Sequence, residues 1–393
     1  MQNIQITRGF MGGLSPSTTL KMTQKAKDMK AQGIDVCSMS AGEPDFDTPK
    51  YIKDAAIEAL NSGKTGYTDS SGLPELRKAC AEKFIKDNNI QTTPAQVIVG
   101  PGAKFSVFSA IAALCGPGDE VIIPAPFWLS YPEMVTAAGA KSVFVDTKAE
   151  NNYELLPADL EKAVTANTRL LILNTPSNPT GAIYRKATLE AIAALAVKHN
   201  FMVLSDEIYE ELVYEKDFPH ISIGALNKEI SELTITVNGF SKAYAMTGWR
   251  LGYLTAPLWL SKKINALQSH LTSNPTTFAQ YGALKALACG KEEVYKMRDS
   301  FATRRDLIYN LVSSEIPKVK SIRPQGAFYL FCDISACGLK SGEFCDRLLE
   351  EEKMVAIPGD AFGADNCLRL SYACSEQNIR TAVSRLKNFC SKF

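Results

Sequence analysis

The sequence predicts an α/β protein with a mostly parallel central sheet flanked by helices in a large domain, and a smaller α+β domain. Between residues 97 and 255, short apolar runs alternate with segments whose apolar residues recur at helical spacing. The runs are apolar throughout, which is typical of strands buried on both faces. Beyond residue 260, long helical patterns and two strand-like segments replace this alternation.

The chain before residue 97 is expected to be mainly helical. An irregular arm containing Gly12, Gly13 and Pro16 comes first, and Gly33 ends the polar helix that follows it. Pro74 marks another helix start, because proline is favoured in the first helical turn. Helices are therefore expected over residues 18–32, 50–61 and 74–88, with a turn-rich loop over 41–49.

Strands and helices then alternate along the chain. Strands are expected at residues 97–99, 120–123, 142–145, 170–173, 201–204, 233–237 and 252–255. Helices are expected at residues 102–115, 129–138 and 186–199. Asn238 and Gly239 are expected to break the strand that precedes them. Such alternation implies parallel strands joined by helices that cover both faces of the sheet.

The remainder of the chain is expected to form the smaller unit. Residues 260 to about 315 follow a helical pattern with a break at Pro275, and include a helix that joins two domains. Strands at 327–332 and 366–371 and helices at 342–352 and 376–389 follow. We therefore divide the chain into an N-terminal arm with part of the small domain (1–45), a large domain (46–300) and a small C-terminal domain (301–393).

The composition is that of a globular protein. Of 393 residues, 46% are apolar and 22% charged, so a large core is available. The net charge of +1 gives no strong attraction to nucleic acid or to membranes. No apolar run approaches the ~18 residues of a membrane span, and the N-terminus lacks the pattern of a signal peptide. Ten scattered cysteines and three distant histidines predict no metal site, and free thiols in a cytoplasmic protein.

Reactive and polar residues follow the predicted strands. Open α/β sheets bind ligands beyond the carboxyl ends of their strands. Five groups occupy that position and would meet at one rim: Gly102-Ala103-Lys104, Trp128, Asn174 with Asn178, Asp206, and Lys242. Each also has an ordinary structural interpretation, such as a turn residue for Asn178 or a helix N-cap for Asp206. Their shared position favours a common functional site.

Lys242 lies just past a buried strand, which is an unusual place for a lysine. A buried amine has a lowered pKa and can form a Schiff base with a carbonyl. Arg250 offers a guanidinium fork suited to a phosphate, and the helix that starts at Gly102 and Ala103 offers its first N–H groups. From this stretch alone, a surface lysine and arginine on a loop remain the alternative.

The residues from Ser241 to Arg250, Ser-Lys-Ala-Tyr-Ala-Met-Thr-Gly-Trp-Arg, resemble the pyridoxal-phosphate lysine signature of class I aminotransferases, especially the bacterial aspartate aminotransferase branch. The resemblance covers nearly the whole chain and implies the fold-type I architecture of that family. It rests on further motifs in the family's order: residues 41–46, 66–67, 102–104, 131–132, 174–181, 205–209 and 368–372.

The resemblance implies that pyridoxal 5'-phosphate is the cofactor and acts as an electron sink. Lys242 would carry it and then act as the general base. Asp206 would pair with the pyridine nitrogen, Tyr209 and Asn178 would hydrogen-bond the phenolic oxygen, and Trp128 would stack on the ring. The implied phosphate contacts are Gly102, Ala103, Lys104, Ser241, Arg250, and Tyr67 from a second subunit of a homodimer. A serine that many relatives use is replaced here by Gly239.

The same resemblance implies how substrates bind. Arg369 would hold the α-carboxylate, beside the backbone N–H of Gly42 and near Trp128 and Asn178. Lys104 and Thr19 would meet a distal carboxylate, which implies aspartate and 2-oxoglutarate in a ping-pong exchange. Prephenate, aromatic or alanine aminotransferase activity is the alternative.

Three other classes of function compete with this interpretation. A carbon–sulfur lyase would use the same lysine and cofactor. A DNA-binding regulator built on this core would need an extension that the first forty residues are too short and too weakly basic to supply. A dehydrogenase would need the G-x-G-x-x-G spacing, which the Gly100-Pro101-Gly102 loop lacks.

Overall fold

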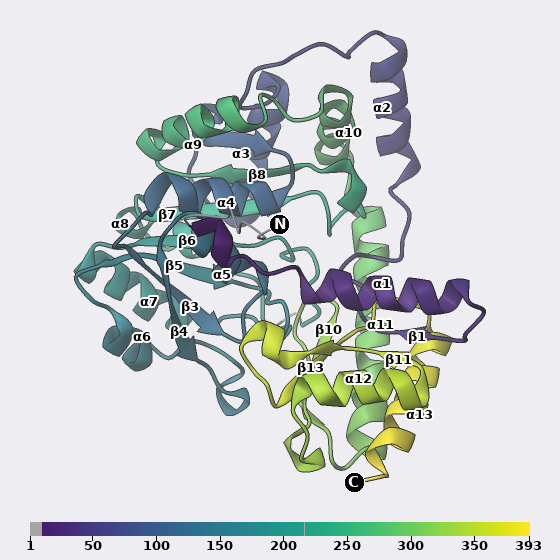
Figure 1. The fold of residues 1–393 in the computed structure, drawn as a ribbon. Helices are drawn as coiled ribbons and strands as arrows, with labels where there is room; N and C mark the ends of the chain where they lie inside the picture. Colours follow the sequence, from purple (N-terminus) through teal and green to yellow (C-terminus); the bar gives the residue numbers. More distant parts are fainter. Residues whose placement is uncertain (1–9, 216) are drawn as a thin grey trace, which may run out of the picture.

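The computed structural model describes residues 10–215 and 217–393. Figure 1 shows a large unit around a central sheet and, beside it, a smaller unit built from both ends of the chain. The α-helices are α1 Thr18–Ala31, α2 Lys50–Asn61, α3 Pro74–Asn88, α4 Ala103–Leu114, α5 Ser130–Ala137, α6 Pro157–Ala163, α7 Lys186–His199, α8 Lys228–Ser231, α9 Leu258–Leu271, α10 Thr277–Ala288, α11 Glu292–Glu315, α12 Ser341–Glu352 and α13 Glu376–Cys390.

The large sheet has seven strands in the order β2-β8-β7-β6-β5-β3-β4. Its strands are β2 Val97–Gly100, β3 Glu120–Ala125, β4 Lys141–Asp146, β5 Thr168–Asn174, β6 Met202–Asp206, β7 Thr234–Gly239 and β8 Gly252–Thr255. Strand β8 is antiparallel to both of its neighbours, and the remaining pairs are parallel. The carboxyl ends of the other six strands therefore meet at one rim, where β8 begins.

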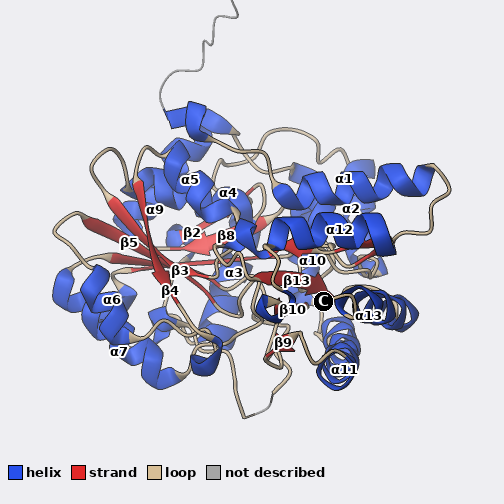
Figure 2. Ribbon diagram, turned by 60° about the horizontal axis from the view of Figure 1, so that its bottom comes forward, coloured by secondary structure: helices blue, strands red, loops and turns tan. Residues whose placement is uncertain are grey.

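Helices cover both faces of this sheet, as Figure 2 makes visible. Val121 and Ile123 of β3 pack with α4, α5 and α9, whereas Ile122 between them packs with α6 and α7. Strand β3 thus buries successive side chains on opposite faces, which explains its continuous apolar sequence.

The smaller unit combines the two ends of the chain. Its four-stranded sheet has the order β12-β13-β10-β9, with β9 Lys320–Ser321, β10 Tyr329–Asp333, β12 Ile357–Pro358 and β13 Cys367–Ser371. Strand β1 (Cys37–Ser38) pairs in parallel with β11 (Met354–Val355), so the N-terminal segment joins this unit.

Helix α11 connects the two cores. Val294 in its first turn packs with the core under β2 and β8, whereas Met297, Phe301 and Ile308 pack in the core of the smaller unit. A single continuous helix therefore contributes to both cores, in the region where the sequence predicts a joining helix.

The fold class is confirmed, with two local corrections. Strand β7 continues through Asn238 and Gly239, which pair with Tyr253 and Gly252, so these residues do not break the strand. Helices α6 and α8 were not predicted. The domain boundaries at residues 45 and 300 remain predictions. Within the described residues, no helix is both long and apolar enough to cross a membrane.

Candidate active site

A cavity of about 580 Å³ lies at the rim where the parallel strands end. The smaller unit closes it from the other side, through α1, the segment at residues 38–43, and strands β10 and β13. It brings together most residues that the sequence predicts for a site: Thr19, Gly42, Ala103, Lys104, Trp128, Asn178, Asp206, Tyr209, Ser241, Lys242, Arg250 and Arg369.

Lys242 projects into this cavity from the loop that joins β7 to β8. The residues on either side of it, Ser241 and Ala243, are buried, so the loop is fixed while the lysine side chain faces the cavity. Its ammonium donates to the carbonyl oxygen of Gly42 over 2.5 Å. Burial lowers the pKa of Lys242 to about 8, so the amine gives up its proton far more readily than a surface lysine.

Arg250 lies against the start of helix α4. Gly102 precedes that helix with φ of +91°, and a Cβ there would lie only 2.5 Å from Nη2 of Arg250. The glycine is therefore required both by its backbone conformation and by the guanidinium packed on it. Because the first N–H groups of a helix lack intrahelical partners, this corner combines free donors, a helix dipole and a fixed cation.

Asp206 ends strand β6 and is buried deep in the cavity wall, 4% exposed. Its Oδ2 accepts a hydrogen bond of 2.8 Å from the hydroxyl of Tyr131, and its Oδ1 accepts a longer one of 3.3 Å from the backbone N–H of Ile208. Burial raises the pKa of Asp206 to about 6. The carboxylate is thus poised to ionise near neutral pH and to pair with a buried cationic group.

Two hydrogen-bonded pairs of residues border the same wall of the cavity. The hydroxyls of Tyr209 and Tyr329 lie 2.8 Å apart, and burial holds the pKa of Tyr209 well above its ordinary value. Asn174 donates to the carbonyl oxygen of Asp206 over 2.9 Å and accepts from the backbone N–H of Asn178 over 2.8 Å. These bonds fix the backbone from which Asp206 and Asn178 extend.

Arg369 is a buried arginine, 2% exposed, in the middle of β13. Its Nη1 donates to Oδ1 of Asn178 over 2.9 Å and its Nη2 to the carbonyl oxygen of Ser40 over 3.2 Å. The guanidinium carbon lies 4.3 Å from the ring centroid of Tyr329. Its buried Nε has no hydrogen-bond partner among the described residues, so a donor remains for an anion.

Lys104 and Thr19 lie at the outer side of the cavity. The ammonium of Lys104 is 4.9 Å from the ring centroid of Trp128, and burial together with the Arg250 charge lowers the pKa of Lys104. Thr19 lines the cavity, although its hydroxyl oxygen is buried and unpaired within the described part of the chain.

Three predicted residues are placed differently from the rest. Gly102 does not line the cavity, and its backbone N–H donates to the carbonyl oxygen of Gly100 over 2.8 Å. Tyr67 is 91% exposed and does not line the cavity of its own chain. Gly42 lines it through a carbonyl that already accepts from Lys242. A Cβ at Gly42 would lie 4.0 Å from the Tyr329 hydroxyl, so the structure of the chain alone does not require glycine there.

Sequence reasoning missed the roles of Tyr131 and Tyr329. Tyr131 lies three residues after Trp128 at the start of α5, and that helical spacing was the available signal. Tyr329 reaches the site because β10 pairs with β13 in a register that places Phe331 opposite Arg369. Nothing local in the sequence indicates that pairing.

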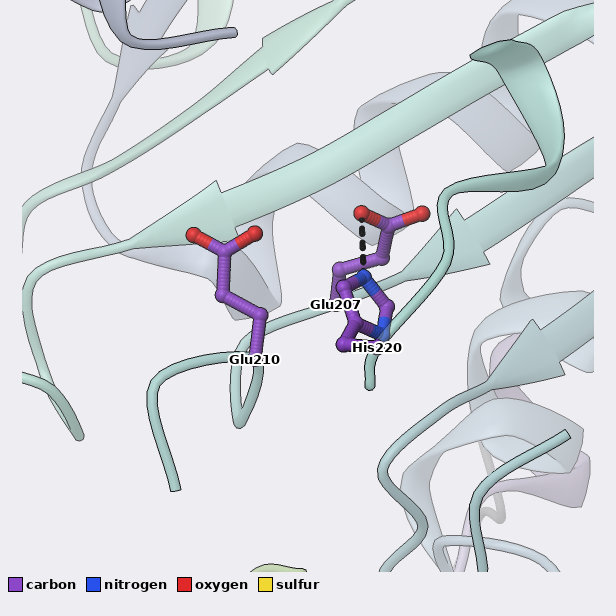
Figure 3. A group of neighbouring side chains, drawn as sticks. All are labelled: Glu207, Glu210 and His220. Atoms are coloured by element: carbon purple, nitrogen blue, oxygen red, sulfur yellow. Dashed lines mark hydrogen bonds and ion pairs between the residues drawn. The ribbon is translucent and has the colours of Figure 1, made fainter. Parts of the chain in front are cut away.

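A second buried polar cluster lies on the other side of the segment that carries Asp206 and Tyr209. Figure 3 shows its three members, Glu207, Glu210 and His220, whose ligand atoms lie within 4.8 Å of one another. His220 Nε2 lies 2.9 Å from Oε2 of Glu207, and the Lys83 ammonium contacts Glu210 and donates to Asn88 over 2.7 Å.

The members of this cluster already pair with one another. Burial lowers the pKa of His220, but the carboxylates of Glu207 and Glu210 outweigh that effect and leave it above its ordinary value. The Lys83 ammonium and the His220 imidazole thus face two carboxylates in an ion-pair network, in which Nδ1 of His220 has no hydrogen-bond partner among the described residues. We therefore regard the cluster as an anchor for the segment between Asp206 and Glu210.

Sequence comparison matches this chain to known aminotransferases over nearly its whole length. The family model for aminotransferase class I and II matches residues 34–386. The aspartate aminotransferase of Bacillus subtilis is 44% identical over 97% of this chain and 98% of its own. The aspartate/prephenate aminotransferase of Cereibacter sphaeroides is 43% identical over 96% and 97%.

A solved structure shares the fold as well. The aspartate aminotransferase from Thermus thermophilus with maleate superposes with a TM-score of 0.93 at 42% identity, over 98% of this chain and 100% of its own. The cavity at the strand ends, the lysine of lowered pKa within it and these full-length matches agree, and the chain therefore belongs to the aminotransferase class I and II family.

Proposed function

We propose that the protein is a pyridoxal-phosphate-dependent aminotransferase that moves the amino group of aspartate to 2-oxoglutarate. One observation carries the proposal: an amine of lowered pKa, a buried carboxylate and two fixed guanidinium groups all border one cavity, at Lys242, Asp206, Arg250 and Arg369. Membership of the family supports the type of reaction, and the residues of the cavity support the choice of cofactor and substrate.

The cavity residues fit pyridoxal 5'-phosphate from end to end. Arg250 and the first N–H groups of α4, with Ser241 beside them, suit the phosphate. Asp206 suits the ring nitrogen, because the carboxylate is buried and no cation among the described residues is bonded to it. Trp128 suits the ring face, and Tyr209 with Asn178 suits the phenolic oxygen.

When bound, the cofactor supplies an electron sink for the charge that develops at the substrate's Cα. The amine of Lys242 takes the proton from that carbon, and its pKa of about 8 leaves part of it unprotonated near neutral pH. Arg369 orients the substrate by its α-carboxylate so that the Cα–H bond faces this amine. The Glu207–Glu210–His220 cluster keeps the Asp206 backbone fixed during turnover.

Lys104 supports a dicarboxylic substrate. It is a cation in a partly dehydrated position next to Trp128, and an uncharged substrate side chain would leave it poorly paired. Both relatives named above carry aspartate in their names, and the Thermus thermophilus structure holds maleate, a dicarboxylate. We therefore assign Lys104, with Thr19, to the distal carboxylate.

A homodimer would complete the site. The 91% exposed side chain of Tyr67 is available to a second copy of the chain, where it would reach the phosphate across the interface. Exposed apolar side chains nearby in sequence, Ile57 and Leu60 on α2, give such an interface apolar area. The ten free cysteines favour a reducing compartment, in accord with a cytoplasmic enzyme.

Prephenate is the second candidate substrate. Its side chain also ends in a carboxylate, and one relative named above is an aspartate/prephenate aminotransferase. Arg369 and Lys104 would bind the two carboxylates of prephenate as they would bind those of aspartate.

The decisive experiment is a screen of half-reactions. The cofactor-loaded protein is mixed with one amino acid at a time, and conversion of the aldehyde to the amine form of the cofactor is followed by absorbance. Aspartate and glutamate are expected to convert it fastest. Conversion by alanine or phenylalanine at equal or higher efficiency would contradict the dicarboxylate assignment, and release of ammonia without amino transfer to an added oxo acid would indicate a lyase.

A further inference from the structure

We propose that Tyr131 is a positioning residue that keeps Asp206 ionised and reserves one of its oxygens for the cofactor's ring nitrogen. This inference rests on the proposed function. It starts from one bond: the Tyr131 hydroxyl donates to Oδ2 of Asp206 over 2.8 Å, in a place where Tyr131 is only 2% exposed.

The two oxygens of Asp206 have unequal partners. Oδ2 has a short bond from Tyr131, whereas Oδ1 has only the 3.3 Å bond from the Ile208 backbone. Each oxygen accepts one hydrogen bond within the described residues, but the bond to Oδ1 is the longer and weaker one, so Oδ1 is the oxygen that gains more from another strong donor. Tyr131 thereby decides which face of the carboxylate remains open toward the cavity.

The position of Tyr131 is itself fixed. Its ring lies in the core formed by β3, α4 and α5, and it meets the ring of Trp128 edge-on at 5.2 Å between centroids. Its backbone N–H bonds to the carbonyl oxygen of Trp128 over 3.0 Å. The residue that would stack on the cofactor ring and the residue that holds Asp206 therefore belong to one turn.

A neutral donor suits this task better than a cation. Burial makes the ionised form of Asp206 costly, and the Tyr131 hydrogen bond acts in the opposite direction. An arginine or lysine in its place would also favour ionisation, but it would cancel the charge that a protonated ring nitrogen needs as a partner. Burial keeps the pKa of Tyr131 well above its ordinary value, so the hydroxyl remains a donor at every working pH.

The inference is tested by binding rather than by turnover. The affinity of the cofactor-free chain for pyridoxamine 5'-phosphate, which has no aldehyde and cannot link to Lys242, is measured by equilibrium dialysis from pH 5 to 9. Affinity is expected to fall on the acid side as Asp206 becomes protonated before binding. In Tyr131→Phe this acid limb should move up by about one pH unit, which gives about tenfold weaker binding at pH 5 and comparable binding at pH 8.

Two controls make the result specific. Tyr184→Phe removes another buried hydroxyl, one that accepts from the backbone of Leu155 over 3.1 Å away from the cavity, and should leave the limb unchanged. Asp206→Asn should remove the contribution of Asp206 to the limb and leave only that of the ligand, and adding Tyr131→Phe to it should shift nothing further. The titrations of the ligand itself are the same in every variant and cancel.

The outcomes separate the two proposals. A folded Tyr131→Phe chain with an unmoved acid limb, or a limb that Tyr131→Phe still shifts in the Asp206→Asn background, would overturn the role of Tyr131 while leaving the proposed function intact. If the unsubstituted chain binds no pyridoxamine phosphate at any pH, the proposed function fails and this inference fails with it.

Discussion

Replacing Arg369 with lysine is expected to lower kcat/KM by the same factor for every amino-acid substrate, because all of them carry the α-carboxylate. In the structure the guanidinium is held by Asn178 over 2.9 Å and by Ser40 over 3.2 Å, and it lies on the ring of Tyr329. A lysine keeps the positive charge but has no planar fork, so it cannot satisfy these partners and a carboxylate together.

The size of the effect follows from the bonds lost. One hydrogen bond to a charged group contributes about 1.5–3 kcal/mol, so loss of one arm of the fork lowers kcat/KM by about 10- to 150-fold. Folding stability also falls, by about 1–3 kcal/mol, because the buried Oδ1 of Asn178 loses its donor. Thermal unfolding of the variant measures this second cost separately.

The assay compares kcat/KM for aspartate, glutamate, alanine and phenylalanine in Arg369→Lys and in Lys104→Gln. The first variant should lower all four alike, whereas the second should lower only the two acidic substrates, by about tenfold for ~1.4 kcal/mol of lost pairing. If the ratio of acidic to uncharged substrates changes in Arg369→Lys, or stays constant in Lys104→Gln, the assignment of the two cations is refuted.

Three other predictions test the remaining parts of the site. Borohydride reduction of the cofactor-loaded protein should leave the pyridoxyl label on Lys242. A label on Lys104 instead would contradict the assignment of Lys242 as the lysine that carries the cofactor. Mixing Tyr67→Phe chains with Lys242→Ala chains should restore activity above either parent, since a heterodimer has one intact site; absence of rescue in a verified heterodimer argues against shared sites. Asp206→Asn should stabilise the cofactor-free chain at pH 8 by up to about 3 kcal/mol, because burial raises the pKa of this carboxyl from 3.8 to about 6.

The sign of this last effect follows from linkage. An acid whose pKa rises on folding contributes stability below its unfolded pKa of 3.8 and loses that contribution as pH rises through about 6. The gain from asparagine, measured by thermal unfolding, should therefore vanish toward pH 4. An equal gain at pH 4 and pH 8 would mean that ionisation of Asp206 is not its cause.

Much of the site could be predicted because it follows the strands. Once β3, β5, β6 and β7 were recognised from their apolar runs, the rule for open sheets was enough to bring Trp128, Asn178, Asp206 and Lys242 together. Arg369 was different, because only the family resemblance singled it out within an ordinary strand of the smaller unit. Its buried position and free Nε give that choice a physical reason.

The rest depended on pairings between distant parts of the chain. The parallel pair of β1 and β11 joins Cys37 to Met354, and two-residue strands of this kind have no periodicity to detect. The expected break at Asn238 and Gly239 was wrong because tertiary pairing with β8 overrides the low strand propensity of these residues. A Cβ at Gly239 would lie 3.1 Å from the Cα of Gly252, so the strands approach each other closely at this glycine.

The reversed direction of β8 bears on how the chain tolerates changes in length. Because β8 runs opposite to its neighbours, the connection from Gly239 to Gly252 starts and ends at the cavity, and it carries both Lys242 and Arg250. Every other connection in the sheet leaves the rim and returns only after crossing a face. An insertion in the part of those connections beyond the rim lies away from the cavity, whereas a single added residue between Lys242 and Arg250 would change the spacing between the amine and the guanidinium.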